Sequence, residues 1–343
     1  MKRTIKICFL FIVLIFSVGK INAQQLPIYS QYMFNEYLLN AAYSGTYNFT
    51  PVIFNHRNQW YGFGDSAPQT SSLSIHSPIS AKSSIGTTMI YDQTNPISKT
   101  QIELSYGYRF MLSQKSKLRA SMALSGTYNM VQFTRQENGT YSEMTEGIID
   151  ITNQMNETST VADINFGIIL YNDYFDGGIS IRNLLAPEIL SSNPDDVFDR
   201  VKYLMIHASY FGLSNSNSPI GLIPSIVVRK MGIIKFQGIT QADINLKLIY
   251  RNKIWTGISY RSHEKVFSPT IGFNTRKAFF GYSYDIGTSA LEAYHDGSHN
   301  IVIGFKLAGN KIKNTRRQTP LYMDMDSEWK WLRISDMRNR STP

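Results

Sequence analysis

The chain has 343 residues but a single cysteine, and charged residues make up only 17% of it, against roughly 25% in average soluble domains. The cysteine, Cys8, lies within the first 23 residues, which are expected to be removed, so the mature chain should have none. This absence excludes a disulfide scaffold, a cysteine nucleophile and a thiolate metal site. Stability must then come from burial and backbone pairing.

Long apolar runs are missing as well. No internal segment approaches the ~18 uninterrupted apolar residues that a spanning helix needs, which excludes a polytopic helical membrane protein. Disorder is also excluded, because 43% of the residues are hydrophobic and 21 Tyr and 19 Phe are among them. The aromatic residues alternate with Ser, Thr, Asn and Gln, which favours sheets with one apolar and one polar face.

Residues 1–23 predict a secretory signal peptide cleaved after Ala23. They have a basic start at Lys2 and Arg3, an apolar run from Ile7 to Val18, and a small residue at Ala23. An uncleaved anchor helix is the alternative, although the apolar run is short for a membrane span. Because this segment has four basic residues and no acidic one, its removal lowers the formal net charge from +9 to +5. Most of that charge lies in residues 308–343, which argues against a nucleic-acid partner for the body.

From about residue 50 the apolar residues recur at every second position. Between Gln101 and Phe110, for example, Ile102 and Leu104 share one face while Glu103 lies on the other. Such alternation is typical of strands with one apolar face. We predict fourteen strands, at residues 50–59, 68–77, 84–91, 101–110, 117–128, 161–171, 174–182, 200–211, 220–230, 236–250, 253–262, 268–275, 277–285 and 298–307.

Alternation alone fits a soluble sandwich or an outer-membrane barrel. The strand length of about ten residues, the even strand count and the aromatic residues near strand ends favour an all-β, antiparallel transmembrane β-barrel. The aromatic residues expected at the membrane interfaces are Tyr106, Tyr108, Phe110, Tyr203, Tyr210, Phe279, Phe280, Tyr282 and Tyr284, together with Trp60, Trp255 and Tyr260. Short links at 172–173, 251–252 and 275–276 predict periplasmic turns, and 130–160, 183–199 and 286–297 predict longer external loops.

The chain is thus divided into four segments: a signal peptide (1–23), an N-terminal periplasmic or lumenal segment (24–49), the barrel (50–307) and a basic C-terminal tail (308–343). The second segment is expected to form a short helix or to fill the lumen. The tail forms a C-terminal periplasmic extension if the even-stranded barrel begins and ends on one side. Its residues Trp329, Trp331, Leu332 and Ile334 form a candidate partner-docking patch. A disordered basic tail is the alternative.

Polar residues on the inward faces form a second candidate site. Arg57, Gln59, Arg109 and Arg119 are expected to line the lumen, where they could hold a plug or orient a passing chain. The alternative is that lumen residues only bond one another and fill the barrel.

Motifs for catalysis or cofactor binding are missing. The six histidines are dispersed, and the chain has no Gly-x-Ser-x-Gly elbow, phosphate loop or dinucleotide fingerprint. We therefore expect no catalytic residue, cofactor or metal site, although an outer-membrane hydrolase with a dispersed Ser, His and acid stays open.

Seven blocks of sequence form a distinctive set: Gln25–Asn35, Leu39–Gly45, Arg57–Trp60 with Gly64, Ala67–Thr70, His76–Pro78, Gly281–Asp285 and Gly297–Ile301. Together they resemble the PorP/SprF family of type IX secretion system outer-membrane proteins. They occur in order over nearly the whole mature chain. Two features depart from the family: Asn40-Ala41-Ala42-Tyr43 replaces the usual Asn-Pro-Ala-Tyr, and a tail follows Leu307.

The resemblance implies a non-enzymatic component of type IX secretion in the outer membrane of a Gram-negative bacterium, in contact with outer-membrane lipid. Its implied role is secretion or surface attachment of large cargo proteins, such as gliding-motility adhesins. The implied partners are the C-terminal signal domain of a cargo protein and the periplasmic ring components of the secretion motor. A passive porin or small-solute channel is the alternative, and an open lumen would distinguish it.

Overall fold

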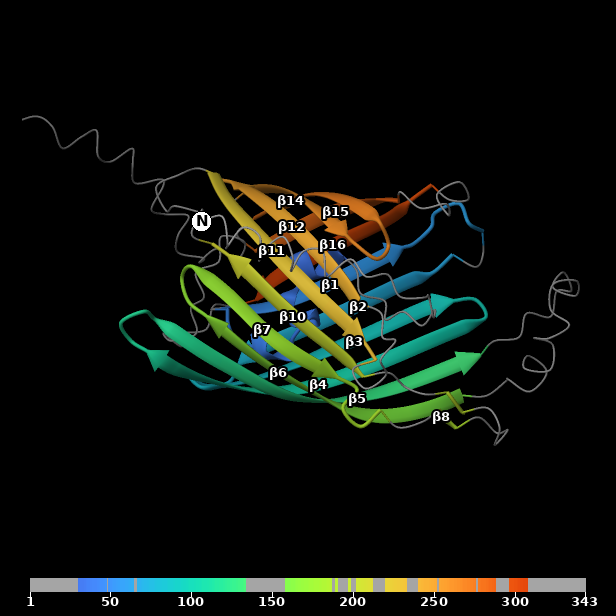
Figure 1. Ribbon diagram of the computed structural model, residues 1–343, viewed down its shortest axis with the longest axis horizontal. Coiled ribbons are helices and arrows are strands. Elements are labelled where there is room, and N and C mark those ends of the chain that lie inside the picture. Colours follow the sequence, from blue (N-terminus) through green and yellow to red (C-terminus); the bar gives the residue numbers. More distant parts are fainter. Residues whose placement is uncertain are drawn as a thin grey trace, which may run out of the picture.

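The computed structural model describes residues 30–47, 49–64, 67–133, 158–186, 189–190, 197–198, 202–211, 220–232, 240–251, 253–275, 277–287 and 296–307. Fourteen strands close into an antiparallel barrel in the ring order β1-β16-β15-β14-β13-β12-β11-β10-β7-β6-β5-β4-β3-β2 (Figure 1). The strands are β1 (Thr50–Asn58), β2 (Gln69–Pro78), β3 (Ser83–Thr94), β4 (Ile97–Ser113), β5 (Leu118–Phe133), β6 (Thr158–Tyr171), β7 (Phe175–Arg182), β10 (Tyr203–Tyr210), β11 (Ile220–Met231), β12 (Thr240–Tyr250), β13 (Ile254–Arg261), β14 (Val266–Asn274), β15 (Ala278–Gly287) and β16 (Ser298–Leu307).

Each of the fourteen predicted strands is present, which confirms the predicted barrel. The strands β4 and β5 are longer than expected, with 17 and 16 residues. The predicted loop at 183–199 also holds a small antiparallel pair, β8 (Ile189–Leu190) with β9 (Val197–Phe198).

The barrel has two unlike ends. Because all neighbours are antiparallel, Thr50 of β1 and Leu307 of β16 lie at one end, which we call the terminal end. The short links after β6, β12 and β14 lie at this end, and the long connections after β5, β7 and β15 lie at the opposite end, the loop end. In Figure 1 the terminal end is at the left, where β6 turns into β7.

The burial pattern places the apolar faces outside and the polar faces inside. On β4 the outward side chains include Leu104, 65% exposed, and Tyr106, whereas Glu103 and Ser105 are buried. The polar side chains of the other strands also point inward: among the described residues, 36 polar or charged residues on barrel strands are buried. A soluble sandwich would bury the apolar faces instead, so this is a lipid-facing belt around a polar lumen.

Some aromatic residues predicted at the membrane interfaces lie inside the barrel. Trp255, Phe279 and Tyr203 are buried at 1%, 4% and 9% exposure. Their neighbours in sequence, such as Ile254, face outward. That prediction was wrong for these three residues because aromatic type alone does not reveal which face of a strand a residue occupies. Tyr106, Tyr108, Tyr210 and Tyr282 are exposed as expected.

Three 3-10 helices precede the barrel: η1 (Ser30–Met33), η2 (Glu36–Leu38) and η3 (Ala41–Tyr43). They lie within the ring of strands, in dark blue in Figure 1. Tyr32, Phe34, Tyr37 and Tyr43 are each 3% exposed or less, so this segment is enclosed by the wall. We call residues 30–47 and 49 the plug. Among the helices of the described part, none has the length and apolar character needed to cross a membrane.

Candidate functional site

Polar side chains bind the plug to the wall on several sides. The Tyr32 hydroxyl donates to Asp243 Oδ2 of β12 at 3.0 Å, and the Tyr43 hydroxyl donates to Asp176 Oδ1 of β7 at 2.8 Å. On the other side, Asn35 Nδ2 donates to Ser74 Oγ of β2 at 2.7 Å. Further plug contacts are Tyr37 with Ser105 of β4, Ser44 with Ser84 of β3, and Gly45 with His76 of β2. The plug therefore reaches across the lumen.

Asn40 attaches the plug to the backbone of the wall. Its amide nitrogen donates to the carbonyl oxygens of Ile168, at 3.2 Å, and Ile179, at 3.1 Å. Its amide oxygen accepts from Ala42 N at 3.0 Å and so caps η3. This close approach requires glycine on β6, because a Cβ at Gly167 would lie 1.9 Å from Asn40 Oδ1.

An apolar layer closes the lumen toward the terminal end. Phe34 of the plug packs on Trp255 of β13, with ring centroids 4.6 Å apart. The layer consists of Phe34, Tyr47, Phe49, Ile53, Phe211, Ile223, Ile249, Trp255, Phe279 and Val302, each 4% exposed or less. A second cluster, on the opposite wall, joins Tyr37 and Tyr43 to Ala123 and Ile169. The lumen at the plug is thus filled with side chains.

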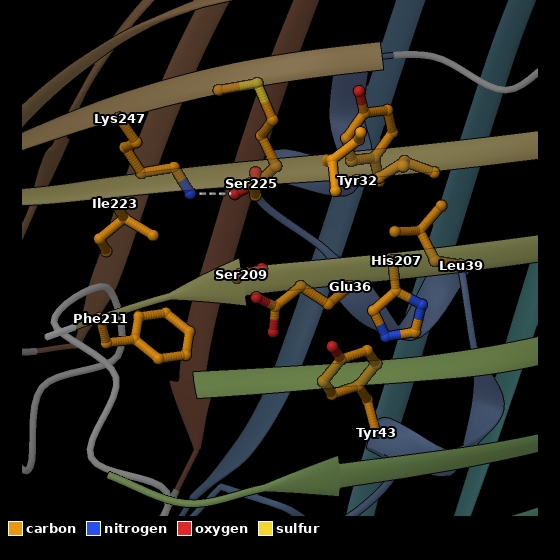
Figure 2. Close-up of a pocket in the computed structure, with 13 residues that line it drawn as sticks. Tyr32, Glu36, Leu39, Tyr43, His207, Ser209, Phe211, Ile223, Ser225 and Lys247 are labelled. Atoms are coloured by element: carbon orange, nitrogen blue, oxygen red, sulfur yellow. Dashed lines mark hydrogen bonds between the residues drawn. The ribbon is translucent and has the colours of Figure 1, made fainter. Parts of the chain in front are cut away.

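A small pocket remains between the plug and strands β10 to β12. Figure 2 shows Lys247, Glu36 and His207 around this space, with Phe211 and Ile223 nearby. Lys247 Nζ donates to the carbonyl oxygen of Met33 at 2.5 Å, and Glu36 Oε2 accepts from the Tyr47 hydroxyl at 2.9 Å. Lys247 therefore attaches the plug to β12, and Glu36 joins two parts of the plug to each other.

Ion pairs gather toward the loop end. Asp285 Oδ2 lies 3.0 Å from Arg57 Nη2 and 2.5 Å from Arg261 Nη2, and Ser268 also donates to this carboxylate. Arg182 pairs with Glu103 at 2.5 Å, and Arg229 pairs with Asp243. Strand direction places these ion pairs on the loop-end side of the apolar layer.

The plug tyrosines are held in their neutral form. Burial raises the pKa of Tyr32 above its ordinary value of 10.0, and the negative charge of Asp243 raises it further. Burial and Glu103 act in the same direction on the pKa of Tyr37. Both hydroxyls therefore keep their protons at neutral pH.

The four predicted lumen residues lie at two different ends. Arg57 is buried at the loop end, beside Asp285, and Gln59 follows β1 there, with its backbone N–H bonded to Pro68 O. Arg109 is buried at the terminal end, where Nη2 donates to Ser80 O at 2.9 Å, and Arg119 lies at the start of β5. The candidate tail residues Trp329, Trp331, Leu332 and Ile334 are outside the described residues.

Sequence reasoning missed the residues that hold the plug, above all Asn40, Asp176, Asp243 and Lys247. Asp176, Asp243 and Lys247 occupy inward positions of predicted strands, so their orientation could have been inferred, whereas Asn40 lies in the plug. The partners of all four are more than 100 positions away in the chain. No group of three or more His, Cys, Asp or Glu residues in the described ranges could hold a metal ion.

An antiparallel barrel with an apolar belt, a polar interior and an internal plug defines a plugged outer-membrane β-barrel protein. The chain matches the family model described as type IX secretion system membrane protein PorP/SprF over residues 21–305. It therefore belongs to the PorP/SprF family of type IX secretion membrane proteins.

Comparison of the fold finds other outer-membrane barrels. The chain is similar to Omp33 of Acinetobacter baumannii (8% identity, TM-score 0.43, covering 77% of this chain and 100% of that one). It is also similar to the CymD monoaromatic hydrocarbon channel (9% identity, TM-score 0.46, covering 84% of this chain and 95% of that one). A third similar structure is the P. putida toluene transporter TodX (8% identity, TM-score 0.42, covering 79% of this chain and 94% of that one). At these scores the likeness supports no inference about function. A search of curated proteins gave no match.

Proposed function

We propose that this protein is a closed, non-enzymatic recognition component of type IX secretion and not a conduit. Its loop end holds a large secreted protein, such as a gliding adhesin, through that protein's C-terminal signal domain. Its terminal end faces the periplasmic ring components of the secretion motor. The observation that carries this proposal is the plug, which contacts strands on both sides of the lumen.

The orientation follows from the connections. Outer-membrane barrels have short periplasmic turns and longer external loops, and the short links after β6, β12 and β14 are at the terminal end. In this orientation residues 308–343 begin on the periplasmic side, where Trp329 and Trp331 could dock on a partner. Residues 1–23 are removed on export by cleavage after Ala23.

A filled lumen argues against the passive porin. An open pore needs a continuous path for water, whereas Phe34 and Trp255 pack within an apolar layer. In addition, Tyr32 bonds to β12 and Asn35 bonds to β2, on the far side of the ring. The apolar layer is the stronger barrier, because an ion that enters it loses its hydration.

Affinity purification of the tagged full chain from detergent-solubilised outer membrane tests the proposal. Stoichiometric recovery of a large secreted protein or of periplasmic ring components, identified by mass spectrometry, is the expected result. The same preparation in planar bilayers should pass no steady ionic current. A barrel that purifies alone and conducts ions would establish the porin instead.

A further inference from the structure

The lipid-facing belt is interrupted along the hairpin β1–β2. On β16 four successive outward side chains are apolar: Ile301, Ile303, Phe305 and Leu307. On β3, the other flank of the hairpin, Ile85, Met89 and Tyr91 face outward, with Thr87 between the first two. Between these flanks, β1 and β2 have only two outward apolar side chains each: Val52 and Phe54, and Ile75 and Leu73.

Residues that lie directly opposite one another on β16, β1, β2 and β3 form a row across the four strands. Strand register shows that the polar outward positions of β1 and β2 lie in rows whose residues on β16 and β3 are apolar. Toward the loop end, Ile301 of β16 lies opposite His56 of β1. His56 lies opposite Ser71 of β2, and Ser71 lies opposite Tyr91 of β3. A row that is apolar on both sides thus becomes polar on the hairpin.

The row nearest the terminal end behaves in the same way. Leu307 lies opposite Thr50, and Ser77 lies opposite Ile85. Thr50 of β1 and Ser77 of β2 are neighbours in the same row, since their hydroxyl oxygens are 2.8 Å apart. The hairpin is therefore polar at both edges of the belt.

The polar side chains of each row bond to one another across the hairpin. His56 Nδ1 lies 3.0 Å from Ser71 Oγ, which uses one of the two ring nitrogens of the imidazole. Hydrocarbon would leave the remaining donor and acceptor capacity of these side chains unsatisfied. Water and lipid headgroups would satisfy it. On β1 and β2 these two rows contain no Asp, Glu, Lys or Arg, so they lack the carboxylate, ammonium and guanidinium groups that would pair with a charged protein surface.

We propose that the bilayer is thinned along β1–β2, so that lipid headgroups and water reach the rows of His56–Ser71 and Thr50–Ser77. Outward positions two residues apart are separated by about 5 Å along the membrane normal in a strand tilted by about 40°. Two apolar positions then cover about 10 Å and four cover about 20 Å. Where the apolar belt of a membrane protein is shorter than the hydrocarbon thickness of the bilayer, the bilayer becomes thinner to match it. The thinned side is next to β16, where the first and last strands of the barrel meet.

Spin labels test this, because the chain has one cysteine, Cys8, outside the barrel. In a Cys8→Ser background, single variants Ile301→Cys, Ser71→Cys and Tyr91→Cys label one row, and Leu307→Cys, Ser77→Cys and Ile85→Cys label the other. Each protein is placed in phosphatidylcholine nanodiscs. Collision with a water-soluble nickel chelate is then compared with collision with oxygen.

Labels at Ser71 and Ser77 should be more accessible to the nickel chelate than both labels that flank them. The expected shift corresponds to about 5 Å toward the aqueous phase. In a bilayer of uniform thickness, each of these labels would give a value between those of its two flanks, and this would overturn the proposal. Labels shielded from both nickel and oxygen would indicate contact with a second copy, which would also overturn it.

Discussion

The hydroxyl of Tyr32 donates to the carboxylate of Asp243, 211 positions away in the chain, at 3.0 Å. It also lies 3.0 Å from Asn245 Oδ1, so the first helix of the plug is attached to β12 at two adjacent inward residues. Because Asp243 is also paired with Arg229 and accepts from Gln241 Nε2, the tyrosine joins a network in the wall. The plug is therefore part of the folded barrel and not an appended tail.

Removal of this hydroxyl should loosen the plug. A hydrogen bond to a charged group contributes about 1.5–3 kcal/mol, so Tyr32→Phe should lower stability by that order. Hydrogen exchange of residues 30–47 should show faster exchange at the plug. Tyr128→Phe is the matched control, because Tyr128 faces outward and is 50% exposed. Equal exchange in both variants would show that the bond to Asp243 does not hold the plug.

Alkaline pH should weaken the attachment of the plug at Tyr32. A detached Tyr32 ionises near pH 10, whereas the docked phenol has a raised pKa and stays neutral above that value. The stabilisation from docking is thus fully present below pH 10 and is lost as the pH rises from there toward the raised pKa. Ionic current in planar bilayers should appear above about pH 10. It should rise less steeply in Tyr32→Phe, and identical profiles would exclude Tyr32 as the cause.

Gly167→Ala should displace Asn40. The new Cβ would lie 1.9 Å from Asn40 Oδ1, so the plug loses its bonds to Ile168 and Ile179 or β6 distorts. We expect a loss of about 2 kcal/mol, from two broken hydrogen bonds, measured by thermal unfolding in detergent. Gly126→Ala on the neighbouring strand is the control, since a Cβ there meets no atom within 4 Å. If both variants unfold at the wild-type temperature, the hydrogen bonds of Asn40 do not require the absence of a side chain at Gly167.

Trp255→Ala should open a cavity in the apolar layer. The side chain is buried against Phe34, and removal of a buried Trp typically costs about 3–5 kcal/mol. The neighbouring variant Ile254→Ala removes a lipid-facing side chain and should cost much less. The two unfolding temperatures in detergent provide the comparison, and a similar loss in both would place Trp255 outside the core.

Substitution of Asp285 should destabilise the ion-pair cluster at the loop end more than substitution of Arg57. Asp285→Asn removes the charge that faces both Arg57 and Arg261, whereas Arg57→Gln leaves Asp285 paired with Arg261. Loss of one partner from a buried pair costs about 3–5 kcal/mol, so Asp285→Asn should be the more destabilising variant in urea unfolding. Lys117→Gln, in the exposed pair with Asp173, is the control and should cost less than about 1 kcal/mol. A larger effect of Arg57→Gln would contradict this arrangement.

All fourteen barrel strands could be predicted because a strand with one lipid face has a period of two that is visible in the sequence. The alternation of Ile102, Glu103, Leu104 and Ser105 shows this, and the structure places the first and third outside. The faces of Trp255 and Phe279 could not be assigned from residue type, since aromatic residues occur both at membrane interfaces and in cores. The plug contacts could not be predicted either, because no local pattern links Asn40 to Ile168 and Ile179.

The sequence by itself determined the barrel, its strand count and the family, because strand periodicity and the order and spacing of the family-like sequence blocks can be read along the chain. Only the tertiary structure decided that the lumen is filled, because this depends on side chains such as Tyr43 and Asp176 that meet after the barrel closes. It also decided where around the barrel the apolar belt is short, because the row that contains His56 and Ser71 is defined by the register between strands.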